Sequence, residues 1–143
     1  MSKRPTMIQW TGKRQFIGTD SGNHSIVISS HDSDNHTGMK PSELMLLALG
    51  SCSGYDIVSI LQKKRVGLRE MRIEISSEQD PDPPWTFRKI HMVFYLQGER
   101  ITEKAARQAV KLSITKYCSV AATLSGKAEI TFDINLDGSH GDR

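Results

Sequence analysis

The stretch PSELMLLALGSCSGYDIVSILQKK, residues 41–64, decides the fold that this sequence predicts. Pro41 suits the first turn of a helix, where its missing N–H is no loss, and no further proline interrupts the stretch. The two lysines at its end lie where cations meet the negative pole of a helix dipole, and Gly67 follows as a stop signal. The sequence therefore predicts one long helix.

The first half of this helix is apolar on every side. Residues 44–49 read LMLLAL, and a helical segment without a polar face must be surrounded by protein. The apolar run is too short to cross a bilayer, and Asp56 follows it. In a chain of 143 residues, we therefore expect a second subunit to help to cover the helix.

On both sides of the helix, apolar and polar residues alternate with the period of two that is typical of half-covered strands. The predicted strands are 7–10, 15–18, 24–29, 71–75, 90–96 and 129–136. Thr102 is placed to cap a helix that runs to about residue 116, and a short helix is expected at 118–124. This order predicts an α+β domain with antiparallel sheets around the long central helix.

Length and composition narrow the class of protein. The length suits a single domain, 1–143, in which 137–143 is expected to be a frayed tail. The net charge of +3 is too small and too dispersed to predict nucleic-acid binding. The N-terminal residues carry neither a secretory signal nor a membrane anchor, so we expect a cytoplasmic protein with no membrane partner.

The two cysteines, Cys52 and Cys118, are too few for a disulfide scaffold or a four-cysteine zinc site. Inert core thiols, one disulfide and a redox pair stay open, although reducing surroundings disfavour a standing disulfide. Cys52 lies between Gly50 and Gly54. Interior glycines cost a helix roughly 1 kcal/mol each, and they persist where another backbone or a ligand comes close. Cys118 lies at a predicted helix start, where N–H groups favour the thiolate.

The segments around the two cysteines resemble one known family. PSEL at 41–44 leads into ALGSCS at 48–53, and AVKLS at 109–113 leads into KYCSV at 116–120. Both resemble the osmotically inducible protein C and organic hydroperoxide resistance family, closer to its broader OsmC-like group. The order of elements agrees from about residue 7 to residue 136, which is nearly the whole chain.

The resemblance implies an intertwined homodimer with active sites at its interface. It also implies a thiol peroxidase that acts on organic hydroperoxides, with hydrogen peroxide as a further candidate, in defence against oxidative stress. Cys52 matches the peroxidatic cysteine, which becomes a sulfenic acid, and Cys118 matches the resolving cysteine, which forms a disulfide with it. No cofactor is expected, because an external thiol or dithiol supplies the electrons.

The family also uses an arginine, which holds the thiolate and orients the peroxide, and a glutamate that holds this arginine. Arg14 and Glu43 are the candidates, with a surface charge on a hairpin as the alternative for Arg14. Ser42 stands where hydroperoxide-resistance members carry the glutamate, so Glu43 is displaced by one position. This departure keeps a second hypothesis open, a non-enzymatic stress-associated or small-ligand-binding domain.

The polar loop over 30–38 offers another kind of site. His31, Asp32, Asp34 and His36 lie in it and have the side chains of metal ligands. The same composition is typical of an ordinary solvated, mobile loop, which we favour. No metal site is therefore predicted.

Overall fold

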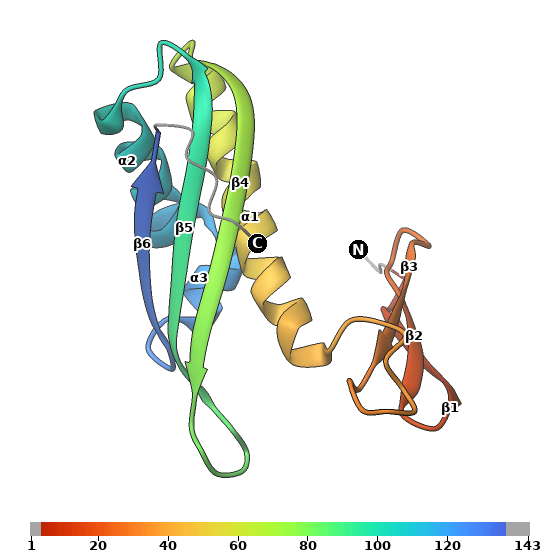
Figure 1. The fold of residues 1–143 in the computed structure, drawn as a ribbon. Helices are drawn as coiled ribbons and strands as arrows, with labels where there is room; N and C mark the ends of the chain where they lie inside the picture. The colour runs from red at the N-terminus through yellow and green to blue at the C-terminus, as the bar shows by residue number, and fades with distance from the viewer. Residues whose placement is uncertain (1–3, 137–143) are drawn as a thin grey trace. The chain divides into compact units, whose positions relative to one another are not determined.

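The computed structural model describes residues 4–136, so the predicted tail 137–143 lies outside the described residues. Three strands precede a long helix, and two strands, three helical segments and a last strand follow it (Figure 1). The predicted α+β class is confirmed. The chain divides into two compact units, residues 1–47 and 48–143, with the boundary inside the long helix.

The N-terminal unit holds a three-stranded antiparallel sheet in the order β1-β2-β3. Its strands are β1 (Met7–Gly12), β2 (Gln15–Thr19) and β3 (Ser25–Ser29), close to the predicted ranges. Lys13 and Asn23 adopt left-handed backbone conformations in the two turns, with φ of 48° and 69°. The meander expected from the turn-forming residues is therefore present.

The long helix, α1 (Pro41–Lys63), confirms the central prediction and ends differently from expectation. Arg65 takes the left-handed conformation, with φ of 59°, and its N–H donates to the Gln62 carbonyl. The N–H of Val66 reaches back to the Leu61 carbonyl, which completes the pair of hydrogen bonds of a Schellman end. The stop is therefore Arg65, and Gly67 begins the next strand.

The C-terminal unit holds a second sheet in the order β4-β5-β6. β4 (Gly67–Gln79) and β5 (Phe87–Glu99) are antiparallel, whereas β6 (Glu129–Asn135) runs parallel to β5. This pair departs from the antiparallel expectation, because a helical connection returns the chain to the starting end of β5. Alternate residues of β5 form the core: Ile90, Met92, Phe94 and Leu96 are all fully buried.

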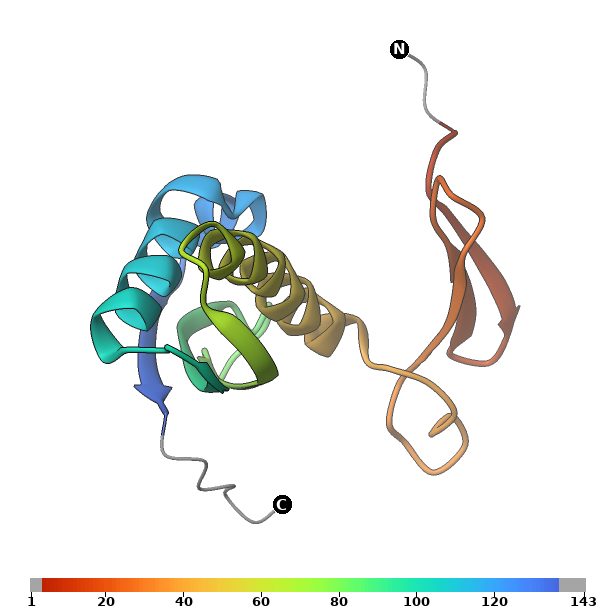
Figure 2. The same ribbon diagram turned by 90° about the horizontal axis from the view of Figure 1, so that it is seen from above.

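In the C-terminal unit, α1, α2 (Glu103–Leu112) and α3 (Ser119–Leu124) lie on the same side of this sheet (Figures 1 and 2). The glycines of α1 explain the close packing, because a Cβ at Gly50 would stand 2.7 Å from Cδ1 of Ile75 on β4. Thr102 caps α2 as predicted, and its hydroxyl accepts from the Ala105 N–H at 3.1 Å. Helix α2 is shorter than expected, since a π-helical turn follows it at Ser113–Tyr117.

Helix α1 is long and apolar enough, by length and composition, to cross a membrane. An 18-residue window has a mean hydropathy of 1.7, and 33% of that window is buried within the described chain. The core helix of a soluble protein can have the same length and composition. Gly50 packs on β4, and Asp56 one turn further on bonds to a serine of the same unit, as a core helix would.

Candidate functional site

Cys52 lies in the middle of α1, half-buried, in a segment of small residues. It is two positions from both Gly50 and Gly54, which face β4. At about 100° per residue, two positions place the thiol roughly opposite the glycines around the helix axis. The glycines thus bring α1 close to the sheet while Cys52 faces away from β4.

Cys118 lies where two helical segments meet. The π-helical turn η1 (Ser113–Tyr117) ends at it, and the Cys118 N–H donates to the Ser113 carbonyl at 2.8 Å. Its backbone is extended, and its sulfur caps α3 by accepting from the Ala121 N–H at 3.3 Å. The predicted position at a helix start is confirmed, and the side chain is buried, with 2% of its surface exposed.

The fold brings these two cysteines together, although 65 residues separate them in the sequence. The two thiols are hydrogen-bonded to each other. Cys52 Sγ also lies 4.0 Å from the hydroxyl of Ser119, the residue that follows Cys118. A half-buried sulfur on α1 therefore meets a buried sulfur at the start of α3.

Their surroundings push the two thiol pKa values apart. Burial acts to raise the pKa of Cys52, but hydrogen bonds from the Cys118 thiol, from the Val120 N–H and from the hydroxyl and N–H of Ser119 outweigh it. The pKa of Cys52 therefore lies below its ordinary value. Burial dominates at Cys118, and the neighbouring Cys52 acts in the same direction, so the pKa of Cys118 is raised. The more accessible sulfur is the one that favours the thiolate, the reactive form.

A polar contact fastens the π-helical turn to α1 beside the cysteines. Asp56 lies one turn after Cys52 and accepts from the hydroxyl of the buried Ser113 at 2.8 Å. The same hydroxyl lies 3.5 Å from the Ser53 carbonyl oxygen. π-Helical turns are frequent at functional sites. Ser113 thus fixes the segment that carries Cys118 against the helix that carries Cys52.

Arg14 lies in the N-terminal unit with an exposed side chain, and it is paired there. Its guanidinium lies 3.9 Å from the carboxylate of Asp32, and its backbone N–H donates to the side chain of the buried Asn35. Asp32 also accepts from the Ser30 hydroxyl, from Asn35 and from the Asp34 N–H. Led by the Ser30 hydroxyl, these groups lower the pKa of Asp32 to about 2.

Glu43 is exposed in the first turn of α1, and within residues 4–136 its carboxylate forms no ion pair. The structure therefore places Arg14 with Asp32, whereas the family resemblance implies a partnership with Glu43. Asp32 carried only a metal-ligand reading at the sequence level. The signal for its partnership with Arg14 depends on a loop that folds back, which spacing alone does not show.

The polar loop of residues 30–38 is held by its own hydrogen bonds. His31 Nε2 lies 2.8 Å from the Gly38 carbonyl, and the rings of His31 and His36 are 4.3 Å apart. Over residues 4–136, no group of three or more His, Cys, Asp or Glu side chains is arranged to hold a metal ion. These side chains bond to the loop itself, and this network was not foreseen.

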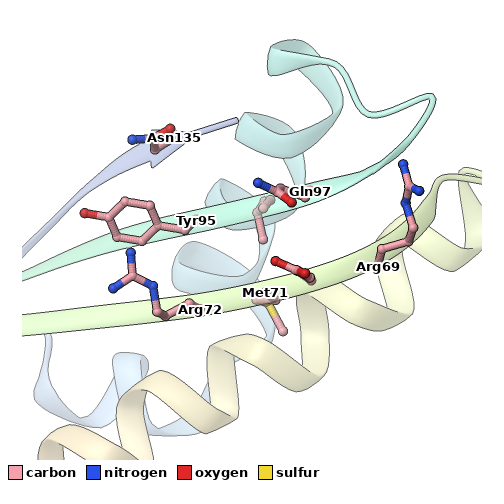
Figure 3. A pocket seen from close by; sticks show the side chains of 8 residues that line it. Arg69, Met71, Arg72, Tyr95, Gln97 and Asn135 are labelled. Carbon is pink, nitrogen blue, oxygen red and sulfur yellow. The ribbon is translucent and has the colours of Figure 1, made fainter. Parts of the chain in front are cut away.

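A separate hollow of about 390 Å³ lies on the face of the β4-β5-β6 sheet that points away from α1 (Figure 3). Arg72 stacks its guanidinium 4.0 Å from the centre of the Tyr95 ring and pairs with Glu74. Met71 points to the opposite side, where it meets Gly54 of α1. The hollow contains neither cysteine, and its central cation is already paired within the chain.

Sequence and structure comparisons agree on the family. The sequence model described as OsmC-like protein matches residues 31–135. Protein YhfA of Escherichia coli is 34% identical over 124 residues, which cover 87% of this chain and 91% of that protein. A solved hypothetical protein from Aquifex aeolicus is 29% identical, with a TM-score of 0.79 over 96% of this chain and 99% of its own.

The organic hydroperoxide resistance protein OhrB of Bacillus subtilis has the same fold. It is 16% identical, with a TM-score of 0.62 over 91% of this chain and 97% of its own. The resemblance carried by the two cysteine segments is thereby confirmed at the level of sequence and fold. The chain belongs to the OsmC-like protein family.

Proposed function

We propose that this chain is a cysteine-based peroxidase that reduces organic hydroperoxides in defence against oxidative stress. One observation carries the proposal: Cys52 and Cys118 are hydrogen-bonded, and the more accessible of them has the lowered pKa. A peroxidatic cysteine must be both ionised and reachable, whereas its resolving partner must wait close by. The shared fold with an organic hydroperoxide resistance protein supports the same class of substrate.

The first step uses the Cys52 thiolate as nucleophile. Its sulfur attacks one oxygen of the peroxide, the O–O bond breaks, and the departing alkoxide takes up a proton and leaves as an alcohol. Cys52 is then a sulfenic acid. Hydrogen peroxide would react in the same way and release water.

The second step joins the two cysteines. The Cys118 thiolate attacks the Cys52 sulfur, the S–O bond breaks, and the departing hydroxide takes up a proton to form water. The resulting disulfide is reduced by thiol exchange with an external thiol or dithiol, which is oxidised in turn. The proposal needs no resident cofactor, and the reducing thiols of a cytoplasm would supply the electrons.

We further propose that the active form is a homodimer. Several large apolar side chains are exposed in the single chain, on the N-terminal strands and on α1: Met7, Ile8, Trp10, Ile26, Val27, Leu47 and Tyr55. Contiguous exposed apolar surface is typical of interaction sites. A second copy would cover this surface, as expected from a helix whose first half is apolar on every side.

Arg14 and Glu43 enter this proposal through the family resemblance. Arg14 would hold the Cys52 thiolate and orient the peroxide, and Glu43 would hold Arg14, from the same chain or from its dimer partner. To do so, Arg14 must exchange Asp32 for Glu43. Its 3.9 Å contact with Asp32 is exposed, and exposed ion pairs contribute only about 0–1 kcal/mol.

The same contact favours a second candidate function. With Arg14 paired to Asp32 and Glu43 free of ion pairs, the chain lacks the arginine–glutamate pair of an efficient peroxidase within residues 4–136. A non-enzymatic stress-associated or small-ligand-binding domain would keep the fold without that pair. Its mark would be cysteines that stay reduced in the presence of peroxide.

Mass spectrometry of the reduced protein after one equivalent of an alkyl hydroperoxide separates the two functions. We expect a Cys52–Cys118 disulfide, and persistent free thiols would support the non-enzymatic domain instead. Cys52→Ser is expected to abolish peroxide consumption. Cys118→Ser is expected to allow one oxidation and then stall. Unchanged consumption by Cys52→Ser would rule out the proposed mechanism.

A further inference from the structure

The two cysteines sit in two Cys-Ser dipeptides that cross over. Ser119 follows Cys118 in the sequence, and its hydroxyl oxygen lies 4.0 Å from Cys52 Sγ. Ser53 follows Cys52, and its hydroxyl faces the Cys118 sulfur. Each serine thus serves the cysteine of the other dipeptide.

Ser53 is the more informative of the two serines. Its side chain is fully buried, and within the described part of the chain its hydroxyl has no oxygen or nitrogen partner at hydrogen-bonding geometry. A buried hydroxyl without a partner costs about 1–3 kcal/mol. The backbone cannot swing away to relieve this, because the Ser53 carbonyl lies 3.5 Å from the Ser113 hydroxyl in the same buried contact.

The sulfur of Cys118 is the acceptor that Ser53 faces. A neutral thiol is only a weak acceptor, whereas a thiolate is a strong one, since hydrogen bonds to a charged group are about twice as strong. A hydroxyl that is left without a partner beside a thiol therefore favours the ionised sulfur. This contact opposes burial, which by itself holds Cys118 in the neutral form.

We propose that Ser53 and Ser119 are positioning residues of the disulfide step: the Ser53 hydroxyl stabilises the Cys118 thiolate, and the Ser119 hydroxyl stabilises the charge at Cys52. The assignment of a step to them rests on the proposed function.

In that step the Cys118 thiolate supplies the electron pair of the new S–S bond. The S–O bond of the Cys52 sulfenic acid breaks, and the hydroxide leaves with the bonding pair and takes a proton to become water. Ser53 lies beside the attacking sulfur, and Ser119 lies beside the sulfur from which hydroxide departs. The external thiol or dithiol of the proposed cycle then returns both cysteines to thiols.

The first experiment titrates each thiolate by its ultraviolet absorbance and uses no peroxide. In a Cys52→Ser background, Ser53→Ala is expected to raise the midpoint of Cys118 by about one pH unit, the size of a weak charged hydrogen bond. In a Cys118→Ser background, Ser119→Ala is expected to raise the midpoint of Cys52 by on the order of 0.5 units, and Ser119→Thr is expected to restore it. Unchanged midpoints would overturn the inference.

The matched control is Ser59→Ala, an exposed serine on the same helix, which is expected to leave both midpoints in place. Circular dichroism verifies that each variant is folded, and the exposed Ser119 gives a reading even if Ser53→Ala fails to fold. A shift common to Ser59→Ala and the two test variants would also overturn the inference.

The second experiment follows disulfide formation in the otherwise unchanged protein at pH 7 after one equivalent of an alkyl hydroperoxide. A midpoint raised by one unit means about tenfold less Cys118 thiolate, so Ser53→Ala is expected to form the disulfide about tenfold more slowly. Oxidation of Cys52 should keep its rate. A protein that forms no disulfide at all refutes the proposed function, whereas the titrations test the serine contacts independently of it.

Discussion

The two units of the chain bury their side chains in very different ways. In the C-terminal unit, one face of β5 is closed completely, and the side chains of Ile90, Met92, Phe94 and Leu96 expose no surface. In the N-terminal unit, Ile8 and Trp10 of β1 expose 63% and 66% of theirs. One unit carries its own hydrophobic core. The other has paired strands with little beneath them, so its stability must depend on a surface from elsewhere.

The largest effect is expected from Phe94→Ala in the C-terminal core. Removal of a fully buried phenylalanine leaves a cavity and costs about 3–5 kcal/mol of unfolding free energy. Urea unfolding followed by circular dichroism measures the loss. Val93→Ala on the opposite face of β5 is the control and should cost much less. A loss below about 1 kcal/mol for Phe94→Ala would show that this unit lacks the tight core described above.

The next effect concerns the polar fastening of the same unit. Ser113→Ala removes the 2.8 Å donor of Asp56 and leaves a partly buried carboxylate without it, at a cost of about 1–3 kcal/mol. Urea unfolding measures this cost. A double mutant with Asp56→Ala should lose less than the sum of the two single variants. Strict additivity would mean that the contact contributes nothing.

A smaller effect on stability, but a distinct one on association, is expected in the N-terminal unit. Trp10→Ala removes an exposed ring, so we expect it to change the stability of the single chain by less than about 0.5 kcal/mol. If a second copy covers β1, the dimer should weaken by about fivefold or more, which sedimentation velocity measures. Trp10→Phe keeps an aromatic ring and is the control. Equal dissociation constants would place the dimer surface elsewhere.

The smallest effect is expected from the Arg14 loop. The pKa of Asp32 is lowered to about 2, so its contribution to stability is present above the ordinary carboxyl value and is lost as the pH falls through about 2. Thermal unfolding between pH 2 and pH 5 should therefore show a steeper acid loss for the unmodified chain than for Asp32→Asn. Because this carboxylate is exposed, the difference should be small. Parallel pH profiles would contradict it.

Much of the fold follows from local sequence patterns. Period-two alternation predicted all six strands, and Pro41 with the unbroken apolar run predicted α1. Alternation does not encode strand direction, which is why the parallel pairing of β5 and β6 was missed. The helix stop was placed at Gly67 because glycine tolerates the left-handed backbone best, whereas Arg65 adopts it here.

The site was predictable only as far as its sequence motifs extend. Cys52 and Cys118 each stand in a recognisable segment, and the structure brings them into contact. The bond between Asp56 and Ser113 joins residues 57 positions apart, so no spacing rule points to it. The partnership of Arg14 with Asp32 likewise depends on how a loop folds back. The roles of Arg14 and Glu43 stay predictions.

The π-helical turn before Cys118 holds one residue more than an α-helical turn would, as the bond from the Cys118 N–H to the Ser113 carbonyl records. That extra residue sets the angular phase of everything after it. Deleting one position between 114 and 117 would restore ordinary helical winding and rotate the sulfur by about 100° about the axis, away from α1. A single-residue deletion would thus uncouple the two cysteines while leaving both of them, and nearly all of the sequence, in place.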